Sequence, residues 1–172
     1  IFIEKDKTFT MNKIEAEVIS TSRENLVSEF DVAVYSDKNN APDQQIASYK
    51  NIPIAESDLR FSGLFTDEMT KIYYASIKLP QSLTLAGGTS GTRYWVGLKA
   101  IDDNYDGSDS GVRWITYPSD PASNSKPLMI KTDTPSAAWG EFDNSVETGF
   151  SVFGECKSSL AVNANSAFEF KY

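Results

Sequence analysis

Apolar and polar residues alternate with a period of two along most of this chain, and no other feature constrains its fold as strongly. In the run SEFDVAVYSD (28–37), Phe30, Val32 and Val34 occupy every second position. Successive side chains of a β-strand point to opposite faces, so this spacing predicts a strand with one face on an apolar core. A chain built mainly from such runs has to cover each apolar face with a second layer.

The same period predicts further strands. One holds Ile14, Ala16 and Val18 and could pair with the strand around Phe30. Another, KIYYASIKLP, ends at Pro80, which cannot donate to a strand ladder. The remaining predicted strands are RYWVGLKAI (93–101), VRWITY (112–117), PLMIKT (127–132), GFSVFGE (149–155) and AFEFKY (167–172). No segment of helical length shows a three-to-four spacing, and PIAESDLRFSGLF (53–65) holds at most a short turn.

Together these runs predict a single all-β domain over residues 1–172. About eight or nine strands, separated by turns every 8 to 15 residues or so, are typical of an antiparallel sandwich of two sheets. We expect this sandwich to be jelly-roll-like. Residues 156–172 would form the closing strand and the start of a linker.

The charge and the residue types that are missing exclude several classes of function. The chain has 16 Lys and Arg against 24 Asp and Glu, a formal net charge of −8, so we expect no nucleic-acid partner. It has no histidine, which removes Ser-His-Asp catalysis and every His-ligated metal site. Cys156 is the single cysteine, so an internal disulfide is impossible, and we expect a small buried or edge thiol there.

The start of the chain and its hydropathy bear on its location. Residues 1–10 lack the basic flank and the continuous apolar core of a signal peptide. No run approaches the roughly 18 apolar residues that a membrane-spanning helix needs. Because the chain begins at Ile1 rather than Met, we expect a fragment of a longer protein that does not insert into a membrane.

The loop AIDDNYDGSDSG is a candidate metal site. Its residues match the first half of a D-x-[DN]-x-[DN]-G calcium loop, in which alternate oxygen atoms converge on the ion. The ligands would be Asp102, Asn104, Asp106 and Asp109. The position of the bidentate Glu holds Arg113, so the loop is no EF-hand, and a structural Ca²⁺ in a looser site stands against an ordinary solvated hairpin loop.

Aromatic residues near the same loop are candidate ligand-binding residues. Tyr105, Trp114, Tyr117 and Trp139 could gather at one end of the sandwich and stack on a sugar, with Asp and Asn binding its hydroxyls. The alternative is that each Trp packs in the core, although Trp95 alternates with the apolar set of its strand and could lie on the opposite face.

A pair of carboxylates suggests a different class of function. Glu141 and Asp143 are two residues apart, as in the E-x-D-x-x-E strand of laminarinase-type β-sandwich glycosidases. The third carboxylate is missing, because Val146 occupies its position and Glu147 is one residue out of register. A small glycoside-active enzyme that uses Glu141 and Asp143 is therefore the alternative to a binding module.

Four segments carry a resemblance to a known family: FDVAVYSDKNNAPDQQIAS, GGTSGTRYWVGLKA, GVRWITY and WGEFDNSVETGFSVFGE. In this order they resemble the extracellular β-sandwich accessory modules of secreted Bacteroidetes proteins. The tail LAVNANSAFEFKY is similar to segments that precede a type IX secretion sorting domain. The resemblance implies export to the surface or exterior of a Gram-negative cell, with neighbouring domains in the same parent chain.

These observations predict a non-catalytic accessory module that binds a glycan or a protein ligand through the loop end from Asp102 to Asp109 and Trp114, with a calcium ion fixing the loop. A purely structural connector that orients a neighbouring catalytic domain is a third alternative.

Overall fold

The computed structural model describes the backbone of residues 1–20, 27–65, 71–101, 112–114, 116–118, 128–130, 140–143, 146–148 and 150–158, and the side chains of 1–19, 27–64, 71–101 and 150–158. Most of these residues lie in β-strands, and every strand pairing among them is antiparallel. The all-β prediction is confirmed. A 3-10 turn, η1 (Glu56–Asp58), occupies the segment in which at most a short turn was expected.

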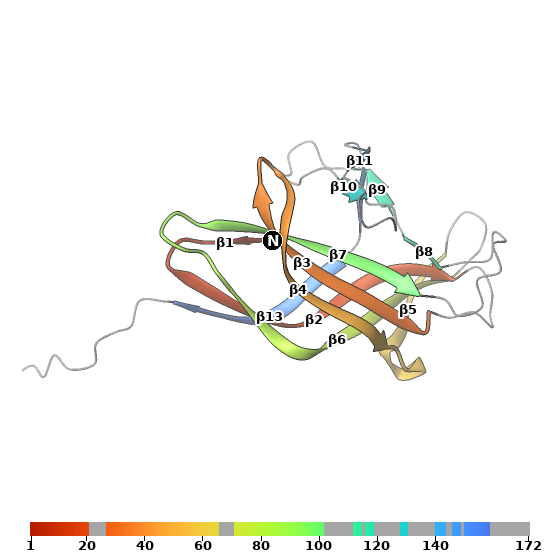
Figure 1. Ribbon diagram of the computed structural model, residues 1–172. Coiled ribbons are helices and arrows are strands. Elements are labelled where there is room, and N and C mark those ends of the chain that lie inside the picture. The colour runs from red at the N-terminus through yellow and green to blue at the C-terminus, as the bar shows by residue number, and fades with distance from the viewer. Residues whose placement is uncertain are drawn as a thin grey trace, which may run out of the picture.

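Two antiparallel sheets form the body of the protein, as a β-sandwich requires (Figure 1). The four-stranded sheet has the order β1 (Phe2–Ile3), β7 (Thr92–Ile101), β3 (Glu29–Lys38) and β4 (Ala41–Pro53). The five-stranded sheet has the order β13 (Phe150–Ser158), β2 (Lys7–Ser20), β6 (Lys71–Ala86) and β5 (Leu59–Phe65), and β8 (Val112–Trp114) pairs with the end of β2.

Four short strands form two separate ladders. These are β9 (Thr116–Pro118) with β12 (Val146–Thr148), and β10 (Leu128–Ile130) with β11 (Gly140–Asp143). No helix within the described ranges has the length and the apolar run needed to cross a bilayer.

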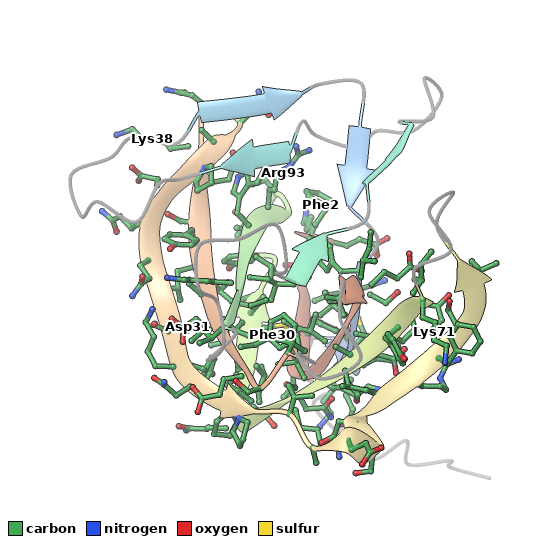
Figure 2. The ribbon with its side chains drawn as sticks, turned by 90° about the vertical axis from the view of Figure 1, so that its right-hand side faces the viewer. Phe2, Phe30, Asp31, Lys38, Lys71 and Arg93 are labelled. Carbon is green, nitrogen blue, oxygen red and sulfur yellow. The ribbon has the colours of Figure 1, made fainter. Side chains whose placement is uncertain are left out.

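The core lies between the two sheets and is built from the residues that the alternation selected. Ile14, Ala16 and Val18 of β2 face Phe30 and its alternating partners of β3, and all of them are buried. Figure 2 shows Phe30 in the space between the sheets and Asp31 on the opposite side of its strand. The fully buried side chains of largest volume are Phe30, Met11, Ile14, Ile77, Leu85, Val32 and Val34.

Two expectations about strand connections are wrong. The strand with Ile14 does not pair with the strand with Phe30: β2 pairs with β6, β13 and β8, whereas β3 pairs with β4 and β7. Alternation identifies the face that a strand buries, but it does not identify the strand's neighbour. The partner of β3 is instead β4, joined by a tight hairpin at Asn39 and Asn40, which both have positive φ. Asn accepts this left-handed backbone more readily than most residues, and it suits two-residue hairpin turns.

Pro80 does not end its strand, contrary to expectation. β6 continues to Ala86, and its register with β2 shifts between the pair Lys13–Lys78 and the pair Met11–Leu83. Pro80 lies in this irregular stretch, where no ladder hydrogen bond is required of it. A proline at a bulge is therefore compatible with a strand of 16 residues.

Candidate functional site

The residues of the predicted loop-end site lie mostly outside the described residues. This applies to Asp102, Asn104, Tyr105, Asp106, Asp109 and Trp139. Trp114 and Tyr117 are placed by their backbone only. Trp114 lies in β8 opposite Val18, and Tyr117 lies in β9 opposite Glu147, so they belong to two different ladders.

The predicted carboxylate pair is also placed by its backbone. Glu141 and Asp143 both lie in β11, opposite Met129 and Leu128 of β10. The register shifts between these two pairs, so one strand carries an extra residue at this point. The side chains of β11 lie outside the described residues.

Among the described side chains, the aromatic and polar groups that could contact a ligand lie together on the outward face of the four-stranded sheet. We call this surface the Trp95 face. Val32 and Val34 of β3, and Val96 and Leu98 of β7, point into the core, so the residues between them point outward. The Trp95 face comprises Ala33, Tyr35 and Asp37 of β3 and Arg93, Trp95 and Gly97 of β7.

Two aromatic side chains stand side by side on the Trp95 face. Tyr35 and Trp95 are direct cross-strand partners of the β3–β7 ladder, and both are half-buried. Directly opposite residues of an antiparallel pair have Cβ atoms about 5 Å apart, so the two aromatic side chains start from adjacent positions on this face.

The indole of Trp95 is held in a defined orientation. Its Nε1–H donates to Oδ1 of Asp37 at 2.7 Å, across the strands β7 and β3. Because the acceptor is a carboxylate, this is one of the stronger kinds of hydrogen bond. Arg93 lies two residues before Trp95 and so on the same face. Its Nη1 is buried and has no hydrogen-bond partner within the described part of the chain.

Small residues adjoin the aromatic pair. Ala33 lies opposite Gly97 of β7 on one side and opposite Ser48 of β4 on the other. These three small residues form a row across the sheet, two residues along the strands from Tyr35 and Trp95. The residues next to the aromatic pair on this face are therefore small, and Ser48 adds an exposed hydroxyl to the row.

A polar cluster borders the row of small residues. Asp31 accepts from Lys50 Nζ at 2.7 Å and from the backbone N–H of Asn51 at 2.9 Å, while the Asn51 side chain donates to Glu29 at 2.7 Å. Burial alone would raise the pKa of Asp31, but the hydrogen bonds from Lys50 and Asn51 outweigh it and lower this pKa. Asp31 is therefore an anion at neutral pH, with only 15% of its side chain exposed.

The structure also bears on Cys156 and on metal binding. Cys156 is exposed and lies in β13 at the edge of the five-stranded sheet, as an edge thiol would. Over the side chains that the structure describes, no three His, Cys, Asp or Glu residues gather closely enough to hold a metal ion. The predicted calcium loop is not among those side chains.

The alternation of β7 indicates that Trp95 could face away from the core, but it does not identify the partners of Trp95. The signal exists in principle, since Tyr35 and Trp95 each fall one residue out of step with the buried set of their strand. Recognising them as a pair needs the register of β3 with β7, because these strands are about 60 residues apart in the chain and local patterns do not set long-range register.

Comparison with known proteins gives no assignment: no family model, no curated protein and no solved structure matches this chain.

Proposed function

We propose that this domain is a non-catalytic module that binds carbohydrate through the Trp95 face. The observation that carries the proposal is the position of Trp95, which lies outside the core beside Tyr35 with its indole fixed by Asp37. A large aromatic side chain gains most by packing inside a protein. One that is fixed on an outward face, next to a second ring, is suited to contact a ligand.

The chemistry of the Trp95 face fits a sugar. Rings of Trp and Tyr offer apolar surfaces on which the C–H face of a pyranose can stack, and a few fixed polar groups then give orientation. Ser48 supplies a hydroxyl next to the rings, and the cluster around Asp31 supplies carboxylate and amide groups at the border. Arg93 adds a positive charge two residues before Trp95 on the same face.

The absence of catalysis is part of the proposal and rests on the sequence. The chain has no histidine for general base chemistry near neutral pH. The only glycosidase-like pattern, around Glu141 and Asp143, lacks its third carboxylate. Sugar release that disappears in Glu141→Gln would overturn this part of the proposal.

The cellular context is likewise a proposal, supported by the resemblance to accessory modules of secreted Bacteroidetes proteins. We propose a place in a larger secreted or cell-surface protein, next to neighbouring domains and, after residue 172, a type IX sorting domain. Sequencing of the complete reading frame, followed by fractionation of the cells that express it, tests this placement. A parent chain retained in the cytoplasm would contradict it.

The experiment for binding is a glycan array followed by titration of the retained glycans. Trp95→Ala is expected to weaken binding by at least about tenfold, as the loss of a central aromatic contact does. Tyr74→Ala is the matched control, because Tyr74 stands on the outward side of the five-stranded sheet beside Arg60 and far from the Trp95 face. Trp95→Phe keeps an aromatic ring but loses the hydrogen bond to Asp37, and its binding should fall between wild type and Trp95→Ala.

The outcomes separate this proposal from the others. Equal losses in Trp95→Ala and Tyr74→Ala would point to general destabilisation and contradict the Trp95 face. Losses confined to Trp114→Ala or Trp139→Ala would move binding to the loop end. No retention of the wild-type domain on any plant, algal or host glycan would favour the structural connector.

We further propose a structural Ca²⁺ held by Asp102, Asn104, Asp106 and Asp109. The support is the chemistry of the sequence, which concentrates oxygen ligands on both sides of Gly107. A metal that binds only the folded state stabilises it by about 2.7 kcal/mol at 100 times its dissociation constant. Excess EGTA should therefore lower the melting temperature, and Asp106→Asn should be less sensitive to EGTA. An unchanged melt in EGTA would remove the metal.

A further inference from the structure

The edges of the two sheets differ in how well they are protected against pairing with another strand. β1 is only two residues long. The β3–β4 ladder has three register shifts, and β4 contains Pro42 and Pro53. The register of β5 with β6 breaks between Phe61 and Phe65, around Gly63 with φ of +86°. Shortness, prolines and bulges are the usual means by which proteins blunt the edges of sheets.

The edge strand β13 has only one of these protections, a register shift with β2 between Phe153 and Gly154. It has nine residues and no proline, and every residue except Val152 is exposed. Within the described strands it pairs with β2 alone, and its register with β2 runs without a shift from Gly154 to Ser158. A regular, exposed edge of this kind is a template for an incoming strand.

We propose that β13 pairs in antiparallel fashion with β13 of a second copy of this chain, with the two-fold axis at Cys156. This register places Glu155 of each copy opposite Lys157 of the other, and Gly154 opposite Ser158. Glu155 and Lys157 point to the same side of the strand, where they form an exposed ion pair of 3.2 Å within one chain. In the dimer the same charges form two cross-strand pairs.

The charge pattern selects both the partner and the register. Opposite charges that face each other across an antiparallel pair stabilise it, and like charges destabilise it. A shift of the axis to Glu155 or to Lys157 would bring that charge opposite its own copy. Only the register centred on Cys156 pairs both charges favourably and leaves an uncharged side chain on the axis. A second copy of this segment is thus self-complementary, as a two-fold interface requires.

The first experiment is sedimentation velocity over a concentration series in reducing buffer, so that no disulfide contributes. Wild type should show a reversible monomer–dimer equilibrium. In a dimer of Glu155→Lys, both cross-strand pairs would bring two lysines together, and in a dimer of Lys157→Glu both would bring two glutamates together. Each variant alone should dimerise at least about tenfold more weakly, because both symmetric pairs change from attraction to repulsion.

A mixture of the two variants gives the decisive result. Glu155→Lys offers two positive charges and Lys157→Glu offers two negative ones, so the mixed pair should dimerise when neither variant does so alone. Asp43→Lys and Lys38→Glu change the same charges at exposed positions near the β3–β4 hairpin, and both should leave dimerisation unchanged. Their melting curves, with those of the β13 variants, confirm that all four proteins are folded.

The second experiment locates the axis. A short bismaleimide that links two cysteines should join wild-type chains through Cys156 in good yield, because directly opposite side chains lie about 5 Å apart. The link should form in the mixture of variants and fall in each variant alone. Wild type that stays monomeric to about 1 mM would refute the proposal. A dimer that neither charge variant weakens would equally refute it.

Discussion

Asp31 offers a sharp test of how this sandwich tolerates an irregular strand. Ile52 pairs with Phe30, and Tyr49 pairs with Val32. Two residues of β4, Lys50 and Asn51, therefore lie opposite the single residue Asp31. Asn51 takes φ of +52°, which leaves the regular strand conformation. The carboxylate of Asp31 accepts from Lys50 Nζ and from the backbone N–H of Asn51, so it gives this bulged backbone donor an acceptor.

The expected loss in the free energy of unfolding follows from these two interactions of Asp31. A hydrogen bond to a charged group contributes about 1.5–3 kcal/mol, and the lower end applies here because Asn51 is exposed. Lys50 is 66% exposed, so its ion pair adds about 0.5 kcal/mol. Asp31→Ala should therefore cost about 2 kcal/mol, Asp31→Asn about 1 kcal/mol and Lys50→Met about 0.5 kcal/mol. For a chain of 172 residues, 2 kcal/mol lowers the melting temperature by about 4–8 °C.

Urea denaturation across a pH series measures these differences. The pKa of Asp31 is lowered in the folded state, so its stabilisation is complete above the unfolded pKa of about 3.9 and is lost as the pH falls through the folded pKa. The gap between wild type and Asp31→Ala should thus be constant near neutral pH and narrow in acid. An Asp31→Ala variant within about 0.5 kcal/mol of wild type, or a gap that widens in acid, would refute the reasoning.

Two further predictions concern packing. Phe30 has no exposed surface, so Phe30→Ala leaves a cavity in the centre of the core. In urea denaturation this variant should lose about 3–5 kcal/mol of stability. A loss below about 1.5 kcal/mol would mean that the core collapses around the cavity. Gly87→Ala would place a Cβ at 1.8 Å from the backbone oxygen of Glu4 and should cost more than about 2 kcal/mol. Gly63→Ala meets no atom within 4 Å and should lose only about 1 kcal/mol through its positive φ, so equal costs at the two glycines would contradict this account.

The alternation of apolar residues was sufficient to predict most of the long strands and their buried faces. β2 and β3 bury the residues that the period selected, and β7 packs its inner residues, partly buried, against them, because a two-sheet sandwich gives each of these strands one inner face. β4 was harder to recognise. Its three register shifts disturb the alternation, and its interior from Asp43 to Ile46 is wholly exposed.

The pairing of strands that are distant in the sequence was not predictable from local patterns. β2 pairs with residues 72–86 of β6 and with residues 150–158 of β13, and contacts this distant in sequence leave no local trace. The same limit applies to the Trp95 face. Nothing in the sequence marks Trp95, Tyr35 and Asp37 as a group. They come together only because β3 pairs with β7. Site prediction from sequence therefore favoured residues that cluster along the chain, such as Asp102 to Asp109.

The two proposals place their surfaces on different sheets, and this separation makes their combination testable. The Trp95 face belongs to the four-stranded sheet, and the pairing edge is β13 of the five-stranded sheet, so pairing through β13 leaves both Trp95 faces open. A dimer would then bind a polymeric glycan at two points, and the second contact would gain from a high effective concentration. Glu155→Lys should accordingly bind a soluble oligosaccharide with wild-type affinity but bind the immobilised polymer markedly more weakly. Equal binding of the variant and the wild type to the polymer would show that the domain engages its ligand one copy at a time.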